Sequence, residues 1–207
     1  MSRKICAVIA PEVFISPASD FLETELGGQS VLSLTLKAVV EAGVDQIICI
    51  GSTPSFLAAA KEVEVDSPMS MVHLDSHQIQ SHLEAISSYL ESPKEETDIV
   101  ILAGNQPLLE AGDISAVIDS HAQSQAAVSI SSGGAATLNS GTVLVTDKKQ
   151  RVTEVVASRT AFRFSSEEDS LTEAYGLYVF AADLLGPAVR RAKPLSGYVH
   201  VLSLIHI

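Results

Sequence analysis

Short runs of apolar residues alternate along the chain with segments in which apolar residues recur every three or four positions. The short runs have the length of buried strands, and the spaced segments have the period of amphipathic helices. Strands that alternate with helices indicate βαβ units and a mainly parallel sheet. The strands predicted in this part of the chain cover residues 5–10, 46–51, 69–74, 99–103 and 126–130.

Helices are predicted in the intervals between these strands. The first, over residues 30–42, has an apolar face that includes Val31, Thr35 and Leu36, and Gly43 is placed to end it. Further helices are predicted over residues 56–62 and 111–123, and another after Ser76, which is placed as its N-cap.

The pattern changes after the fifth predicted strand. Residues 131–134, Ser-Ser-Gly-Gly, predict a loop, and residues 142–156 predict a β-hairpin around the polar segment 147–150. A strand over 177–180 and a helix over 182–192 follow. The chain contains no internal repeat and no linker, so a single domain is expected, with an α/β first half and a second half richer in β-structure.

Composition and charge limit the possible partners. The 207 residues are 46% hydrophobic and 18% charged, which is typical of a globular protein. The net charge of −12 opposes binding to nucleic acid and to anionic membranes, so neither is expected as a partner. The first apolar run is too short for a signal peptide. The two cysteines, Cys6 and Cys49, lie in apolar runs, which predicts buried thiols in a reduced, cytoplasmic protein.

The connection between the first strand and the first helix is long and has no cation. No Lys or Arg occurs between Lys4 and Lys37, whereas Glu12 and other acidic residues lie in this connection. Loops that cradle phosphates use glycines and a nearby Lys or Arg. The pair Gly27-Gly28 could belong to such a loop, but a turn that leads into the helix fits better.

Asn105 follows the strongest strand directly, at a position where parallel sheets bind ligands. An Asp there could bind Mg²⁺, whereas Asn is neutral and a poorer ligand for a hard cation. The alternative is that this segment is a simple turn. A group formed by His73, His77, His82 and Asp75 could suggest a metal site, but surface or core histidines are favoured.

Five segments occur in a recognisable order: residues 7–10, 26–32, 100–109, 151–156 and 173–180. In this order they resemble the nucleotidyltransferase-like domain of sugar-nucleotide pyrophosphorylases, above all the uridylyltransferase domain of bacterial UDP-N-acetylglucosamine pyrophosphorylase. The resemblance implies a three-layer, Rossmann-like nucleotide-diphospho-sugar transferase fold. Its sheet would be mainly parallel, with a β-hairpin excursion in the second half.

The resemblance also marks a candidate pocket, in which most functional residues of the family are replaced. The glycines of the family's nucleotide loop fall on Ala10 and Glu12, its arginine on Phe14 and its lysine on Phe21. The metal-binding aspartate falls on Asn105, so no metal ligand is assigned. The positions that keep a family glycine or basic residue are Gly104, Gly141, Arg159 and Gly176.

These replacements bear on the reaction that the family catalyses, the attack of a sugar 1-phosphate on the α-phosphate of a nucleoside triphosphate. Cations and metal stabilise the charge of its transition state. Their loss predicts weak or lost catalysis and a regulatory or scaffold role. One alternative is an active enzyme with rewired contacts, which would use Arg159 or Arg163 for phosphate and Mg²⁺ as cofactor. Another is an interaction module for a fused C-terminal domain. A nucleotide or a nucleotide-sugar is the expected small-molecule partner.

The end of the sequence departs from the resemblance. Residues 202–207, Leu-Ser-Leu-Ile-His-Ile, match the translation of an adapter used in library preparation. We therefore expect residues 1–201 to be a nucleotidyltransferase-like domain that is truncated at its C-terminus, and residues 202–207 to be a non-native tail. The alternative is a short final strand.

Overall fold

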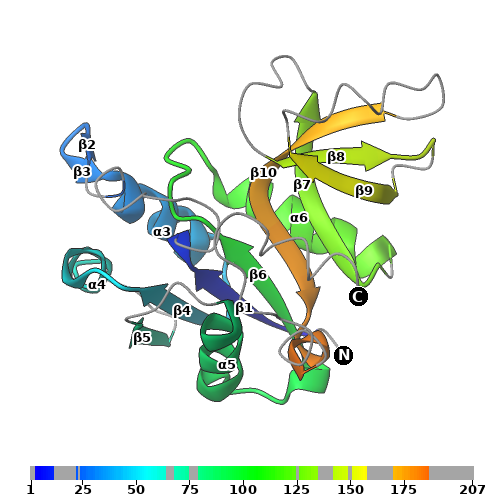
Figure 1. Cartoon of the computed structure of the whole chain (residues 1–207). Coiled ribbons are helices and arrows are strands. Elements are labelled where there is room, and N and C mark those ends of the chain that lie inside the picture. Colours follow the sequence, from blue (N-terminus) through cyan, green and yellow to red (C-terminus); the bar gives the residue numbers. More distant parts are fainter. Residues whose placement is uncertain are drawn as a thin grey trace. The chain divides into compact units, whose positions relative to one another are not determined.

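The computed structural model of the chain contains two compact units (Figure 1). Unit 1 comprises Met1–Ser129 and Tyr178–Ile207, and unit 2 comprises Ile130–Leu177. The structure describes residues 3–11, 22, 24–63, 68–74, 79–124, 126–134, 142–148, 151–157 and 170–186.

The sheet of unit 1 is mainly parallel. Its four parallel strands are β5 (Met69–His73), β4 (Gln46–Gly51), β1 (Lys4–Ile9) and β6 (Thr97–Leu102), in this order across the sheet. The strand β10 (Ser170–Ala181), whose residues 178–181 belong to unit 1, is hydrogen-bonded to β6 and runs in the opposite direction (Figure 1). All six residues of β4 and all six of β6 are buried, as expected for strands that are covered on both faces. The predicted α/β architecture with a mainly parallel sheet is confirmed.

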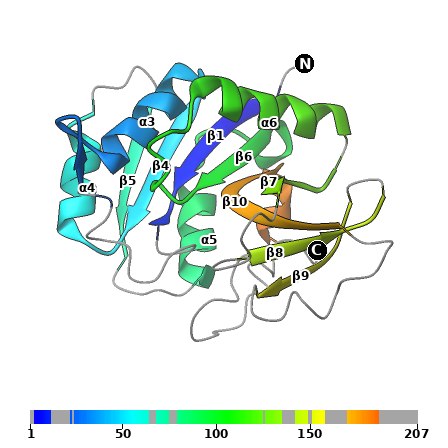
Figure 2. The ribbon, with the colours of Figure 1, turned by 90° about the horizontal axis from the view of Figure 1, so that it is seen from above.

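Helices cover both faces of this sheet. Figure 2 shows α3 (Val31–Glu41) and α6 (Ala111–Ser124) on one side and α5 (Ile79–Tyr89) on the other. The helix α4 (Pro54–Lys61) contacts α3 and the strands β4 and β5. Each of the loops that enter α3 and α4 supplies an N-cap. The hydroxyls of Ser30 and Thr53 accept hydrogen bonds from the backbone N–H groups of Ser33 (3.1 Å) and Phe56 (3.3 Å).

The core of unit 1 is built from alternate residues of the strands. Val8, Ile48 and Ile101 point to the same face and pack with Leu83 and Ile86 of α5. The opposite face is covered by α3, whose buried apolar residues are Val31, Leu32, Leu36, Ala38 and Val39. Because both faces are occupied, only the ends of the strands are left to bind a ligand.

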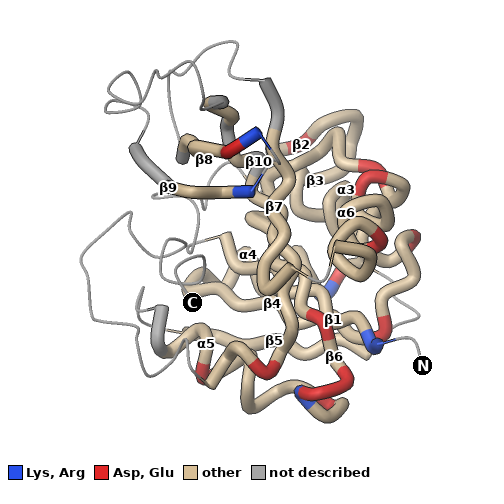
Figure 3. Tube along the Cα trace, turned by 90° about the vertical axis from the view of Figure 1, so that its right-hand side faces the viewer, with Lys and Arg blue, Asp and Glu red and all other residues tan. Residues whose placement is uncertain are grey.

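The charged groups of the central strands lie at the amino ends of β1 and β6 (Figure 3). The Arg3 guanidinium donates to the carboxylate of Asp98 (2.6 Å) and to the carbonyl of Thr97 (2.7 Å). Lys4 donates to the Asp45 carboxylate over 2.8 Å. These pairs therefore stabilise the edge of the sheet that lies away from the carboxyl ends of the strands.

Unit 2 consists of antiparallel strands. β8 (Thr142–Thr146) pairs with β9 (Val152–Ala157) on one side and with the first part of β10 on the other, and β7 (Val128–Gly134) also pairs with β10. The backbone N–H of Asp147 donates to the Arg151 carbonyl (3.0 Å), which closes the turn between β8 and β9. The predicted hairpin is confirmed.

One prediction in this half was wrong, and one predicted strand is longer than expected. Residues 131–134 were expected to form a loop, but they are the second half of β7, because pairing with β10 compensates for the low strand propensity of serine and glycine. The strand predicted over 177–180 extends back to Ser170, because its first residues pair with β8. After β10 the described chain forms a 3₁₀ turn, Ala182–Leu184. Most of the helix predicted over 182–192 lies outside the described residues, and so does Ser76, the predicted N-cap of another helix.

The described helices of the chain include none that is both long and apolar enough to cross a lipid bilayer.

Two glycines adopt left-handed backbone conformations where the chain leaves an element. Gly43 ends α3 with φ +72°, as predicted, and a Cβ added to it would meet no atom within 4 Å. Gly104 follows β6 with φ +79°, but here a Cβ would lie 2.9 Å from Cγ2 of Ile9 and 3.4 Å from Cδ1 of Leu32. Gly104 is therefore required both by its conformation and by close packing.

Because only Gly104 is closely packed, alanine should destabilise the protein more at position 104 than at position 43. Gly43→Ala should lower the free energy of unfolding by about 1 kcal/mol, the cost of a left-handed conformation. Gly104→Ala should cost about 2 kcal/mol or more, because steric overlap adds to the same conformational cost. Urea denaturation of both variants measures these values, and equal losses would contradict the packing around Gly104.

Both cysteines are buried, as predicted, and burial raises the pKa of each thiol to about 12. Only the thiolate is nucleophilic, so at pH 8 neither Cys6 nor Cys49 should react with 5,5′-dithiobis(2-nitrobenzoate) in the native protein. Both should react in urea above the unfolding transition. Rapid labelling of either thiol without denaturant would show that the core of unit 1 opens more easily than its burial indicates.

Candidate functional site

The carboxyl ends of β1, β4 and β6 meet at one edge of unit 1, and this edge is the expected ligand site of a parallel sheet. Ala10 follows β1 directly, is buried, and donates its backbone N–H to the Leu102 carbonyl over 3.0 Å. The described residues that immediately follow the three strands are all neutral, namely Ala10 and Pro11, Ser52 and Thr53, and Ala103, Gly104, Asn105 and Gln106.

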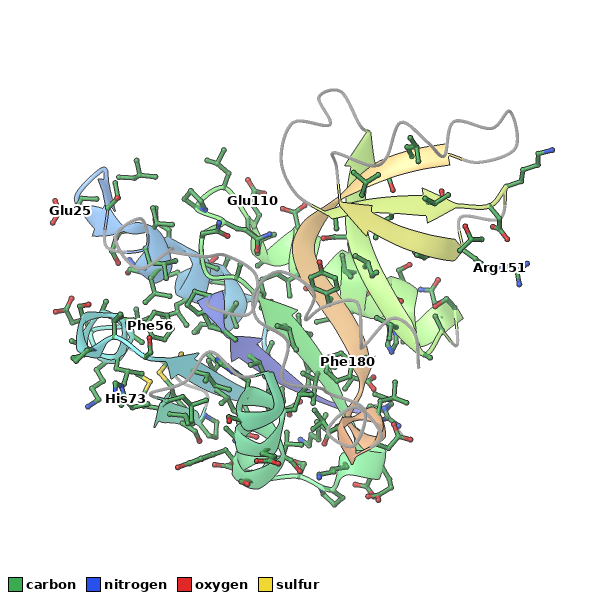
Figure 4. All side chains as sticks on the ribbon, in the orientation of Figure 1. Glu25, Phe56, His73, Glu110, Arg151 and Phe180 are labelled. Carbon is green, nitrogen blue, oxygen red and sulfur yellow. The ribbon has the colours of Figure 1, made fainter. Side chains whose placement is uncertain are left out.

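Apolar side chains fill the space behind this edge. The Cβ that Gly104 lacks would contact Ile9, Leu32 and Leu22, so three aliphatic side chains surround the residue before Asn105. At the end of β4, a Cβ on Gly51 would overlap the ring of Phe56, which is labelled in Figure 4 and almost fully buried. A phosphate at these positions would contact hydrocarbon side chains. Such side chains cannot replace the hydrogen bonds to water that the phosphate would lose.

The loop that carries Asn105 is held by a buried hydroxyl. Oγ1 of Thr35, on α3, lies 3.1 Å from the carbonyl oxygens of both Val31 and Gly104 and can donate its proton to either. The same oxygen accepts the backbone N–H of Gln106 at 3.3 Å. The residues before and after Asn105 are thus both fixed to α3, and Asn105, half-buried, has a defined place at the edge of the sheet.

Thr35 is a residue of the site that the sequence did not identify as functional. It was predicted only as part of the apolar face of a helix. A polar residue on such a face was the available signal, because a buried hydroxyl requires a hydrogen-bond partner. Its partner could not be named from the sequence, since Gly104 is 69 positions away.

The glycine pair forms a turn, as predicted. Gly27 and Gly28 have φ of +62° and +81° and connect the short strands β2 (Glu25–Leu26) and β3 (Gln29–Ser30) in a two-residue hairpin. Both residues of such a turn need positive φ. The turn alone therefore accounts for the two glycines, and no bound phosphate is needed to explain them. Glu25, labelled in Figure 4, is exposed beside this turn and would repel an anion.

The histidines do not form a metal site in the described part of the chain. His73 is exposed at the end of β5, whereas His82 is buried in α5. His77 and Asp75 lie outside the described residues. The described residues contain no group of three or more potential metal ligands from His, Cys, Asp and Glu.

The structure describes part of the pocket that the resemblance implied. Ala10, Gly104 and Asn105 lie together at the carboxyl edge of unit 1. Gly176 belongs to unit 2, where it has φ +77° within β10. The other candidates, Glu12, Phe14, Phe21, Gly141 and Arg159, lie outside the described residues, as does Arg163.

Comparisons with solved structures identify the fold. A CMP:2-keto-3-deoxy-manno-octonic acid synthetase complexed with CTP matches with a TM-score of 0.69 and 14% identity, over 98% of this chain and 82% of that one. A 4-diphosphocytidyl-2C-methyl-D-erythritol synthase from Anaerococcus prevotii matches with a TM-score of 0.65 and 15% identity, over 97% of this chain and 82% of that one. At such identities the likeness shows the fold alone.

Sequence comparison adds the family. A search of curated protein sequences finds no match to the chain. Residues 22–197, most of the chain, match the MobA-like NTP transferase domain. This match agrees with the order of strands, with the carboxyl edge described above and with the fold of the similar structures. The chain belongs to the family of MobA-like NTP transferase domains.

Proposed function

We propose that this chain is a nucleotidyltransferase domain in which catalysis is weak or lost and which acts in regulation or as a scaffold. The observation that carries this proposal is Asn105. It is held at the carboxyl end of β6, where the resemblance implies the metal-binding aspartate, and a neutral amide replaces the carboxylate there. Without that ligand, Mg²⁺ and the triphosphate lose a shared contact.

The charge around the site supports the same conclusion. Nucleotidyl transfer spreads negative charge over the α-phosphate and the leaving pyrophosphate, so cations at the site stabilise the transition state. Lys4 is at the amino end of β1, and Lys37 lies in the middle of α3; no Lys or Arg occurs between them in the sequence. Removal of a single stabilising group of this kind lowers the rate by about 10²–10³.

The packing of the site supports it further. Ile9, Leu22 and Leu32 surround Gly104, and Phe56 covers Gly51, so aliphatic and aromatic carbon occupies the ends of three strands. These contacts stabilise the fold, because they extend the core to the edge where a ligand would bind. The residues of the former site thus serve stability instead of binding charge.

The names of the similar structures indicate which nucleotide to test first. One is a synthetase complexed with CTP and the other a diphosphocytidyl synthase, while the resemblance of the sequence is to a uridylyltransferase domain. Both comparisons point to a pyrimidine nucleotide. We therefore propose CTP or UTP as the ligand of any binding that remains.

Thermal unfolding tests the proposal. A ligand that binds the native state raises Tm, and a nucleotide at about 100 times its Kd stabilises by about 2.7 kcal/mol. For a chain of this size that corresponds to a rise of roughly 5–11 °C. We expect no Mg²⁺-dependent rise with CTP, UTP, ATP or GTP, and no difference between the wild type and Asn105→Ala.

Two further measurements distinguish this proposal from an active enzyme with rewired contacts. Asn105→Asp should gain Mg²⁺-dependent binding of CTP or UTP relative to wild type, because the carboxylate would stand on a loop that is already held in place. A clear shift of the wild type that Asn105→Ala abolishes, together with release of pyrophosphate in the presence of a sugar 1-phosphate, would overturn the proposal.

A further inference from the structure

The sulfur atoms of the chain are concentrated on two neighbouring strands. The sequence has three methionines and two cysteines. The two methionines that follow Met1 are Met69 and Met71, both on β5, and Cys49 lies on the adjacent strand β4. The register of the two strands pairs Cys49 with Met71. A thiol and a thioether therefore lie next to each other in the sheet.

These side chains share the face of the sheet that α4 covers. Residues paired on neighbouring strands point to the same side, and so do alternate residues of one strand. Val72 belongs to the core on the α5 face, so Met71 and His73 point to the opposite face. On that face a Cβ added to Gly51, the partner of His73, would meet the ring of Phe56 of α4. A thiol, a thioether and an imidazole thus lie between β4, β5 and α4.

A depression of about 390 Å³ opens this group of side chains to solvent. Its lining is mainly apolar and consists of Pro54, Leu57, Ala58, Lys61 and His73. His73, labelled in Figure 4, is exposed, Met71 is partly exposed and Cys49 is fully buried. The three polar or polarisable groups therefore extend from the depression into the interior.

The donor atoms and the charge decide which metal ion fits. Thiolate and thioether sulfur select Cu(I), and imidazole also binds copper, whereas Mg²⁺ and Ca²⁺ require oxygen ligands. Among the described residues that line the depression none is acidic, and Lys61 is basic. A single thiolate neutralises a monovalent ion, whereas a divalent ion would keep a positive charge in an apolar site beside a lysine.

We propose that Cys49, Met71 and His73 bind one Cu(I) ion between β5 and α4. A bond forms between copper and the sulfur of Cys49, whose thiol releases its proton to solvent, while Met71 and His73 each donate a lone pair. Copper keeps its oxidation state, and the complex of ion and thiolate is neutral. This site differs from the group of histidines that the sequence suggested, because sulfur supplies two of its three donors.

Met69 lies outside the proposed site although it is on the same face. Four residues separate Met69 from His73, which is about 13 Å along a strand, too far for both to bind the ion that Met71 binds. Met69 is also at the end of β5 away from the depression, where it does not contribute to the lining. It therefore provides a matched control for Met71.

Competition with the chelator bicinchoninate tests the proposal on the full chain, with a Cu(I) salt as the probe in anaerobic buffer. We expect wild type to take up Cu(I), and Met71→Leu to weaken binding at least about tenfold, because even the loss of a partner outside the ligand shell has an effect of this size. Leucine has nearly the volume of methionine, so the fold is retained. Met69→Leu should bind Cu(I) as wild type does.

The two cysteines provide a second matched pair. Both are buried, but Cys6 belongs to the core on the α5 face, whereas Cys49 is paired with Met71. Cys49→Ala should abolish Cu(I) binding and Cys6→Ala should retain it, and circular dichroism verifies that the variants are folded. X-ray absorption at the copper edge should show sulfur neighbours in wild type and fewer of them in Met71→Leu.

Three results would overturn the proposal. They are a wild type that leaves Cu(I) with the chelator, equal losses in Met69→Leu and Met71→Leu, and a loss in folded Cys6→Ala as large as in Cys49→Ala. Binding of Zn²⁺ as tight as that of Cu(I) would contradict the assignment of the metal. Nucleotide and Mg²⁺ are absent from these measurements, so their outcome is independent of the proposed function.

Discussion

Burial of the parallel sheet on both faces is the constraint on which the rest of unit 1 depends. β4 and β6 are buried along their full length, and α5 packs on one face while α3 and α6 cover the other. The backbone groups of the strands are used within the sheet, and their side chains are used in the core. Ligand chemistry is therefore confined to the carboxyl ends of the strands, where the chain turns outward.

At that edge, stability and chemistry compete for the same positions. Gly104 keeps the close backbone packing that a binding edge needs, but the atoms around it are aliphatic. Thr35 holds the loop on both sides of Asn105, so the position is well ordered although it offers no carboxylate. The described residues at this edge are therefore well ordered, neutral and backed by aliphatic side chains.

The helix α3 has a buried side and an exposed side. One side of it carries the buried residues that cover the sheet and the hydroxyl that holds the Asn105 loop. Its outer side carries Leu34, Lys37 and Glu41, which line an open depression between α3 and the start of α6.

Local patterns in the sequence predicted the main strands and helices of unit 1, the end of α3 at Gly43 and the turn at Gly27-Gly28. The sequence also showed directly that the connection after the first strand has no Lys or Arg. Each of these depends on neighbouring residues or on residue type alone, so each could be predicted. Tertiary structure decided that residues 131–134 form a strand, that Thr35 holds the loop around Asn105, and that aliphatic side chains enclose Gly104. These features arise from contacts between segments that are far apart in the chain. The spacing of apolar residues shows which face of a helix or strand is buried, but it does not show which residues that face contacts.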